Sequence, residues 1–243
     1  MIEHERKRIV LKISGEIFCE PGTRTLNKQL VLSLMQQMVD LAQTYQWSIV
    51  IGGGNFFRGA HEGSQLGLKQ SMGHAVGMLA TIMNGLILQD LLVQTGLKTS
   101  LFCALDGFAL GKPITPQNLR HALENDDCLI FTGGIGVPYF TTDTTAVVRA
   151  LQIEAHKIWK LTKVAGIFSA DPHYDKNARL LKKINYTDAL QNKLGFMDAT
   201  ALVLASEHKL IIRVFSMYEP NALIKAAQDP YFGSILSSHE GKS

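Results

Sequence analysis

Cysteine is scarce in this sequence, and blocks of one charge are missing from it. The three cysteines, Cys19, Cys103 and Cys128, are an odd number without metal-ligand spacing. This excludes a disulfide framework and predicts reduced, mostly buried thiols in a cytoplasmic protein. The formal net charge is only +3, and the lysines and arginines are scattered along the chain. No nucleic-acid partner is therefore expected.

Long apolar runs, linkers and repeats are missing as well. The longest apolar stretch, 76–93, is interrupted by Thr81, Asn84 and two further polar residues, which predicts a buried helix and no membrane partner. The N-terminal segment MIEHERKR lacks the apolar core of a signal peptide. A chain of 243 residues without internal breaks predicts one large α/β domain over 1–243.

What stands out instead is the stretch 49–59, IVIGGGNFFRG. Apolar β-branched residues predict the end of a buried strand. The three glycines that follow allow a sharp turn whose N–H groups can converge on an anion. Arg58 lies close enough to clamp phosphate oxygens. A tight strand-to-helix turn without a ligand is the alternative.

Two further turns could also bind an anion at the end of a strand. Ser14 and Gly15 end a strand over 8–13, so that Lys12 would point a mobile charge into the crevice, unless it is a solvated lysine at a strand end. A second glycine-rich turn follows a strand over 127–131 and leads into a helix N-terminus, which favours anion binding. The alternative is an ordinary helix capped by Thr142 or Asp143. A phosphate would repel Asp143 unless a lysine or Mg²⁺ lies between them.

Strands alternate with helices along the chain, which predicts a mainly parallel sheet covered on both faces. The glycine turns should then meet at one sheet edge, where two phosphate-bearing ligands could exchange a phosphoryl group. The segment 107–112 is no P-loop, because it is one residue short and Pro113 replaces the hydroxyl residue. The expected strands are 8–13, 47–51, 98–104, 127–131, 157–161, 210–215 and 232–236, and the expected helices are 27–45, 72–95, one from about 142, 186–193, 199–208 and 220–228.

Seven segments, in order along nearly the whole chain, carry a likeness to one family. They are KISG at 12–15, IGGGNFFRG at 51–59, GMLATIMNGLILQD at 77–90, VPYFTTDTTA at 137–146, TKVAGIFSADP at 162–172, MDATA at 197–201 and IRVFSM at 212–217. These segments resemble the bacterial UMP kinases of the amino-acid kinase family. The combination of GGGNxxRG with GMLATxMNG is specific to these enzymes within the family.

The resemblance implies transfer of the ATP γ-phosphoryl group to UMP in pyrimidine nucleotide biosynthesis, with Mg²⁺. It implies a three-layer α/β/α sandwich in which an acceptor half, roughly 1–155, and an ATP half, roughly 156–243, share one sheet. A homohexamer built from dimers is expected, with GTP and UTP as effectors.

The resemblance also assigns roles to single residues, leaving the metal ligands open. Lys12, Asp143 and Asp198 are expected to be catalytic, with both aspartates orienting Lys12 and the metal. The expected ATP-binding residues are Lys12, Ile13, Ser14, Gly15, Gly54, Arg58, Thr162, Phe168 and Asp171. The expected UMP-binding residues are Gly53, His74, Ile135, Gly136, Val137, Pro138, Tyr139, Phe140, Thr141 and Thr142.

This chain departs from the family pattern near the acceptor. His74 stands where the family has an aspartate that accepts from the ribose hydroxyls. It could accept through a neutral ring nitrogen, approach the acceptor phosphate when protonated, or be a plain surface histidine. Val137 replaces an asparagine, and Ala165 replaces an aspartate. The arginine expected upstream of the aspartate is absent, with Gln70 and Ser71 nearby.

Three other functions fit parts of the pattern. A kinase of the same family acting on a carboxylate or carbamate would share Lys12 and the glycine turns, but it would not be expected to carry GMLATIMNG. A non-catalytic nucleotide sensor or anion-storage protein would not need Lys12, Asp143 and Asp198. A Rossmann oxidoreductase is disfavoured because GGGN lacks the GxGxxG spacing.

Overall fold

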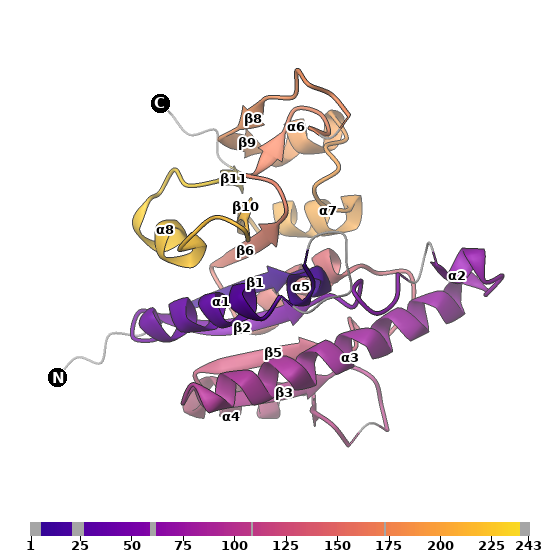
Figure 1. The fold of residues 1–243 in the computed structure, drawn as a ribbon, viewed down its shortest axis with the longest axis vertical. Helices are drawn as coiled ribbons and strands as arrows, with labels where there is room; N and C mark the ends of the chain where they lie inside the picture. The colour runs from indigo at the N-terminus through magenta and orange to yellow at the C-terminus, as the bar shows by residue number, and fades with distance from the viewer. Residues whose placement is uncertain (1–5, 21–26, 59–61, 108, 173, 239–243) are drawn as a thin grey trace.

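The computed structural model describes residues 6–20, 27–58, 62–107, 109–172 and 174–238, and its centre is a nine-stranded sheet (Figure 1). The strand order is β4-β3-β5-β2-β1-β6-β10-β11-β9, and of these neighbours only β10 and β11 are antiparallel. The mainly parallel sheet is thereby confirmed. In chain order the elements are β1 (Lys7–Ile13), η1 (Gly15–Phe18), α1 (Lys28–Asp40), β2 (Tyr45–Ile51), α2 (Glu62–Gln65), α3 (Gln70–Gln94), β3 (Thr99–Cys103), β4 (Lys112–Pro113), α4 (Pro116–Asn125), β5 (Cys128–Thr132), α5 (Thr142–Gln152), β6 (Lys157–Thr162), β7 (Ile167–Phe168), β8 (Leu180–Leu181), β9 (Lys183–Asn185), α6 (Tyr186–Gln191), α7 (Ala199–Glu207), β10 (Ile211–Ser216), α8 (Ala222–Gln228) and β11 (Ser234–Ser237).

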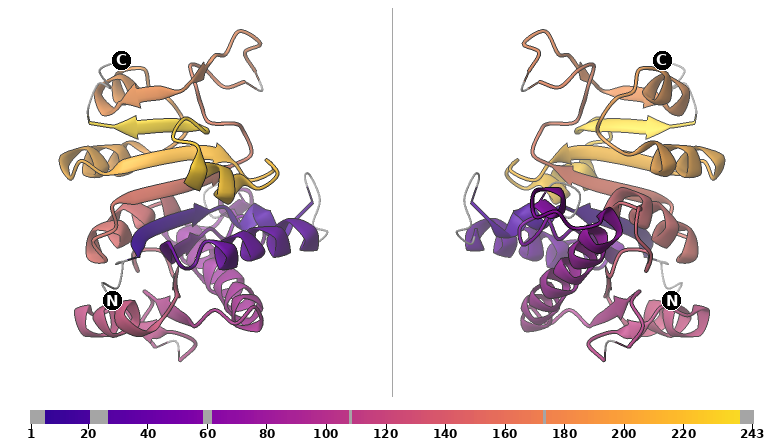
Figure 2. Two further views of the ribbon diagram at one scale, coloured as in Figure 1. Left: turned by 90° about the vertical axis from the view of Figure 1, so that its left-hand side faces the viewer. Right: turned by 90° about the vertical axis from the view of Figure 1, so that its right-hand side faces the viewer.

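Helices cover both faces of the sheet, which gives the three layers that were predicted (Figure 2). Along β1, Ile9 and Leu11 belong to the core shared with α1, α3 and α8, whereas Val10 belongs to the core shared with α4, α5, α6 and α7. This alternation follows from the two-residue period of a strand. Val10 and Leu11 are fully buried, and each such side chain contributes about 1.5–3 kcal/mol.

Helix boundaries follow local capping and packing. The side chain of Asn27 caps α1 by accepting from the backbone N–H of Leu30 at 3.0 Å, as predicted. The helix stops at Asp40, five residues before the predicted end at Tyr45, because Tyr45 starts β2 and packs against Trp47. Likewise α8 begins after Asn221 rather than at a proline.

Several short elements were missed by the sequence pattern. The helix α4 buries only Leu119 and Ala122, so its apolar face is too narrow to produce a clear period. The strands β4, β7, β8 and β9 are two or three residues long. The helix α2 interrupts the predicted loop 60–71, whose residues 60 and 61 lie outside the described part of the chain.

The helix α3 is less buried than predicted. By length and composition it is, in the described part of the chain, the one helix that could cross a membrane, and 39% of its most apolar window is buried inside the molecule. Its inner side packs on β3 and β5. On the outer side Leu79, Met83 and Ile87 are 39%, 49% and 39% exposed.

Candidate functional site

The three glycine-rich turns follow β1, β2 and β5, which lie side by side in the sheet. The turns therefore meet at one edge, as predicted. A Cβ on Gly15 would lie 2.3 Å from Asn55 Oδ1 and 2.5 Å from the Gly52 carbonyl oxygen. Only glycine allows this approach between the first two turns.

Asn84 of α3 holds the second of these turns, the one that follows β2. Its side chain is fully buried, and its amide donates to the Gly52 carbonyl and to Asn55 Oδ1, both at 2.7 Å. Asn55 donates back to Asn84 Oδ1 at 3.0 Å. A polar residue inside an apolar helix is thus explained by the backbone that it holds.

The turn after β5 is braced from two helices. Gly133, Gly134 and Gly136 have φ of 73°, 60° and 94°, in the left-handed region that favours glycine. The hydroxyl of Thr81 on α3 accepts from the Gly133 N–H at 2.8 Å. Arg149 on α5, which is 4% exposed, donates to the Gly134 carbonyl at 3.0 Å, and burial lowers the pKa of Arg149 to about 10.

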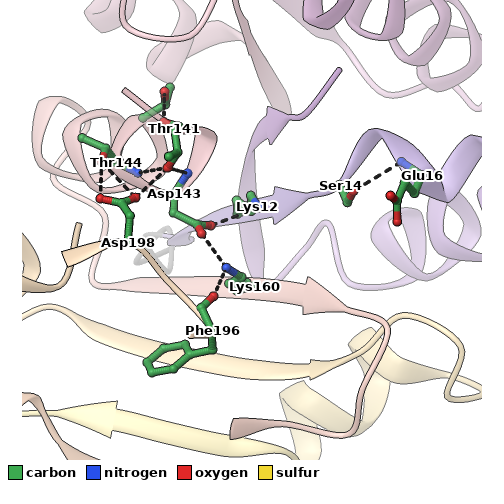
Figure 3. Close-up of polar contacts among 10 residues, drawn as sticks. Lys12, Ser14, Glu16, Thr141, Asp143, Thr144, Lys160, Phe196 and Asp198 are labelled. Atoms are coloured by element: carbon green, nitrogen blue, oxygen red, sulfur yellow. Dashed lines mark hydrogen bonds and ion pairs between the residues drawn. The ribbon is translucent and has the colours of Figure 1, made fainter. Parts of the chain in front are cut away.

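A row of three charged side chains crosses this sheet edge (Figure 3). Asp143, in the first turn of α5, forms an ion pair with Lys12 of β1 at 3.0 Å and with Lys160 of β6 at 2.6 Å. Lys12 and Lys160 are direct partners in the parallel register of β1 and β6. All three side chains are 13% exposed or less. We call these three residues the lysine–aspartate row.

Charge is balanced unevenly in the lysine–aspartate row. Burial alone would raise the pKa of the Asp143 carboxyl, but the ammonium groups of Lys12 and Lys160 outweigh it and hold that pKa below its ordinary value. Burial, and then the charge of Lys12, lower the pKa of Lys160 to about 8, while Asp143 acts in the opposite direction. Two cations and one anion leave one positive charge to meet a negative ligand.

Asp198 joins the N-terminal ends of two helices. It caps α7 by accepting from the Ala201 N–H at 2.9 Å. Its carboxylate also accepts from the hydroxyls of Thr141 at 2.6 Å and Thr144 at 3.0 Å. Asp198 therefore ties the start of α7 to the start of α5 and makes no direct contact with Lys12. The cap of α5 is Thr141, one residue earlier than predicted.

A cavity of about 180 Å³ opens beside α3, and we call it the α3 cavity. Six of the predicted acceptor residues line it, whereas Ile135, Gly136, Pro138 and Tyr139 do not. Five lining residues were not predicted, although three of them fall in the GMLATIMNG segment. The predicted lining residues are Gly53, His74, Val137, Phe140, Thr141 and Thr142, and the others are Phe57, Gly77, Met78, Thr81 and Gly134.

A larger cavity of about 550 Å³ lies between the segments 164–172 and 192–196, and we call it the loop cavity. Phe168 and Asp171, which the resemblance assigns to ATP binding, both line it. Thr162 does not line it, and its hydroxyl donates to the Val164 carbonyl at 2.7 Å.

The remaining predicted residues lie in the first two turns. Ile13 is buried at the end of β1, and Ser14 caps η1 by accepting from the Glu16 N–H at 3.4 Å. A Cβ on Gly54 would come within 3.9 Å of Arg58 only. The guanidinium of Arg58 is ion-paired with Glu16, which also pairs with Lys163.

Lys160 is the member of the lysine–aspartate row that sequence reasoning missed. It occupies a buried position of KIWKLT, a strand whose other inner residues are apolar. A charge inside an apolar strand is rarely tolerated without a partner, and that signal could have identified it.

The lysine–aspartate row connects the two cavities. Asp143 directly follows Thr142, which lines the α3 cavity. At the other end, Lys160 donates to the carbonyl of Phe196, which lines the loop cavity. The arrangement can hold two anionic ligands on either side of a pair of buried ammonium groups.

A glycine-lined crevice with a buried lysine pair on an α/β/α sandwich defines a class of phosphotransferase. The chain belongs to the amino acid kinase family, which matches residues 7–216. Among its relatives, a uridylate kinase of Bifidobacterium longum is 37% identical over 97% of this chain and 96% of its own length. A uridylate kinase of Buchnera aphidicola is 39% identical over 90% of this chain and 91% of its own.

Solved structures show the same likeness. UMP kinase from Ureaplasma parvum superposes with a TM-score of 0.89 at 32% identity, covering 96% of this chain and 99% of that one. UMP kinase from Bacillus anthracis gives 0.90 at 29% identity, covering 96% and 97%. The three-layer sandwich is thus the fold of the amino acid kinase family.

Proposed function

We propose that this chain transfers the γ-phosphoryl group of ATP to UMP, giving UDP and ADP for pyrimidine nucleotide biosynthesis in the cytoplasm. The observation that carries the proposal is the lysine–aspartate row between the α3 cavity and the loop cavity. The uridylate kinase names of relatives that match over nine-tenths of the chain support the choice of acceptor.

In this proposal UMP occupies the α3 cavity and the base of ATP occupies the loop cavity. The phosphates then meet over Lys12, and its ammonium group stabilises the charge that spreads over the transferring group. Asp143 holds Lys12 and Lys160 in place and removes no proton, because a carboxyl with a lowered pKa is a weak base. Asp198 positions Asp143 through Thr141 and the start of α5.

We also propose that the residues up to about 155 form the acceptor half and those from about 156 the ATP half. The α3 cavity is lined only by the first set, and the loop cavity only by the second. Arg58 and the backbone of Ser14 and Gly15 would take part at the phosphates, once nucleotide draws Arg58 from Glu16.

Mg²⁺ fits this site as an ion carried by ATP. Within the described residues, no group of three or more His, Cys, Asp or Glu side chains could hold a metal by itself. Mg²⁺ commonly binds through one or two carboxylates together with substrate phosphates. Asp143 and Asp198 are the carboxylates at this row that would hold the ion, and the ion would neutralise phosphate charge.

Assembly through α3 completes the proposal. The apolar side chains Leu79, Met83 and Ile87 follow one side of this helix at spacings of four residues and are 39–49% exposed. A second copy of the chain would cover them, and such dimers would build the expected hexamer. Met83→Glu should lower the mass measured by light scattering, whereas Glu124→Gln on α4 should not.

A coupled assay of ADP release tests the activity. UMP, CMP, dUMP and UDP are offered as acceptors, with and without GTP and UTP. UMP should give the highest kcat/KM, and GTP and UTP should change the rate in opposite directions. If the chain releases no ADP with UMP but does release it with a carboxylate or carbamate acceptor, the proposed function is wrong. The chain would then be another kinase of the family.

A further inference from the structure

The segment 137–140 borders the α3 cavity and is held at one point. Val137, Tyr139 and Phe140 are 50%, 62% and 45% exposed. Tyr139 has a φ of 74°, in the left-handed region that a residue with a Cβ adopts only when its surroundings hold it there. An outside contact must therefore keep this segment in place.

That contact comes from His74. Its ring atom Nδ1 accepts from the backbone N–H of Tyr139 at 2.6 Å, and the two ring centroids lie 5.3 Å apart. Within the described residues, this is the hydrogen bond that joins 137–140 to another element. His74 itself lies on α3, the helix that Asn84 and Thr81 tie to the glycine turns.

The bond also fixes what the ring can do. A backbone N–H is always a donor, so Nδ1 must carry the lone pair and the neutral ring carries its proton on Nε2. The ring then has no lone pair left for a ribose hydroxyl. The bond therefore excludes both roles that were open to His74 as a nucleotide ligand: the ring has no free lone pair for the sugar, and it cannot meet the phosphate as a cation while Nδ1 accepts.

We propose that His74 is a positioning residue, a latch that holds the segment 137–140 against α3 and so shapes the cavity that receives the acceptor. The proposal rests on the proposed function only for the identity of that acceptor. Its test uses two substitutions that keep different halves of the imidazole. In His74→Asn the amide oxygen can take the place of Nδ1, whereas in His74→Gln the amide group takes the place of Nε2.

Hydrogen exchange of the Tyr139 amide measures the latch without any substrate. In His74→Ala and His74→Gln this amide should exchange about tenfold faster than in the unchanged protein, because about one net hydrogen bond is lost. His74→Asn should stay close to the unchanged protein, as should His156→Ala, which removes an exposed histidine elsewhere. Equal exchange in His74→Ala and the unchanged protein would overturn the proposal. Thermal melts confirm that each variant is folded.

Steady-state kinetics separates a latch from a ligand. His74→Ala should raise the KM for UMP about tenfold, with kcat and the KM for ATP little changed, and His74→Asn should restore most of the loss. Restoration by His74→Gln alone would mean that Nε2 contacts the nucleotide and that the latch does not govern binding. A protein that never phosphorylates UMP would refute the proposed function, and the exchange experiment would still decide about His74.

Discussion

The two cavities of this molecule are built in different ways. The α3 cavity lies against glycine turns that hydrogen bonds from buried polar side chains hold in place. These side chains belong to Asn84, Thr81 and Arg149, which are 0%, 4% and 4% exposed. The loop cavity lies between connecting segments, and its lining includes the exposed Asp171 and Lys193. In the proposed reaction, transfer depends on the alignment of the reacting phosphates, and the buried supports lie beside the turns where these phosphates would meet. The base of ATP would need only to be anchored.

Among the substitutions that distinguish the two cavities, replacing Lys12 should have the largest effect on kcat. Lys12→Ala removes a charge aimed at the transferring group, and the loss of one such preorganised group lowers kcat by about 10²–10³-fold. UMP binding should change far less, because the α3 cavity does not include Lys12. Single-turnover kinetics with calorimetry of UMP binding measures both, and comparable turnover in the variant would refute the role of Lys12.

Replacing Lys160 should have the next largest effect on kcat, and it should also change how kcat depends on pH. Its pKa is about 8, and it is charged below that value and neutral above it. The turnover number should therefore fall as the pH rises through about 8. Lys160→Met should lower kcat by about 10²-fold, as expected for one preorganised charge, and should lack this decline. A decline that persists unchanged in the variant would assign it to another group.

Replacing Asn84 tests how much its buried hydrogen bonds to the turn after β2 stabilise the fold. Asn84→Ala leaves the Gly52 carbonyl and Asn55 without their buried partner, which should cost about 1–3 kcal/mol of the free energy of unfolding. Thermal and urea unfolding measure the loss. Gln94→Ala, at the exposed end of the same helix, is the control and should change stability by less than about 0.5 kcal/mol.

Replacing Phe168 should have the smallest effect, and this effect should be confined to the loop cavity and the KM for ATP. Phe168→Ala removes an aromatic side chain from the loop cavity, which should raise the KM for ATP about tenfold, because stacking on a base contributes about 1–3 kcal/mol. The KM for UMP should not move. Parallel changes in both KM values would show that the two cavities do not act separately.

The sequence predicted the parts of this molecule that local pattern determines. Strand and helix periods located the sheet and its main helices, and the glycine runs located the turns at one edge. The pairing of Lys12 with Lys160 could not be predicted in the same way, because it depends on the register between β1 and β6. The contact of His74 with the Tyr139 backbone is equally non-local, since 65 positions separate its two residues.

A dinucleotide with adenosine and uridine joined through a polyphosphate chain tests most directly whether the two cavities serve one reaction. One molecule should fill both cavities and lie across Lys12. We expect binding of one molecule per chain, inhibition competitive with both ATP and UMP, and a large loss of affinity in Lys12→Ala. Competition with only one of the two nucleotides, at unchanged affinity in Lys12→Ala, would contradict it.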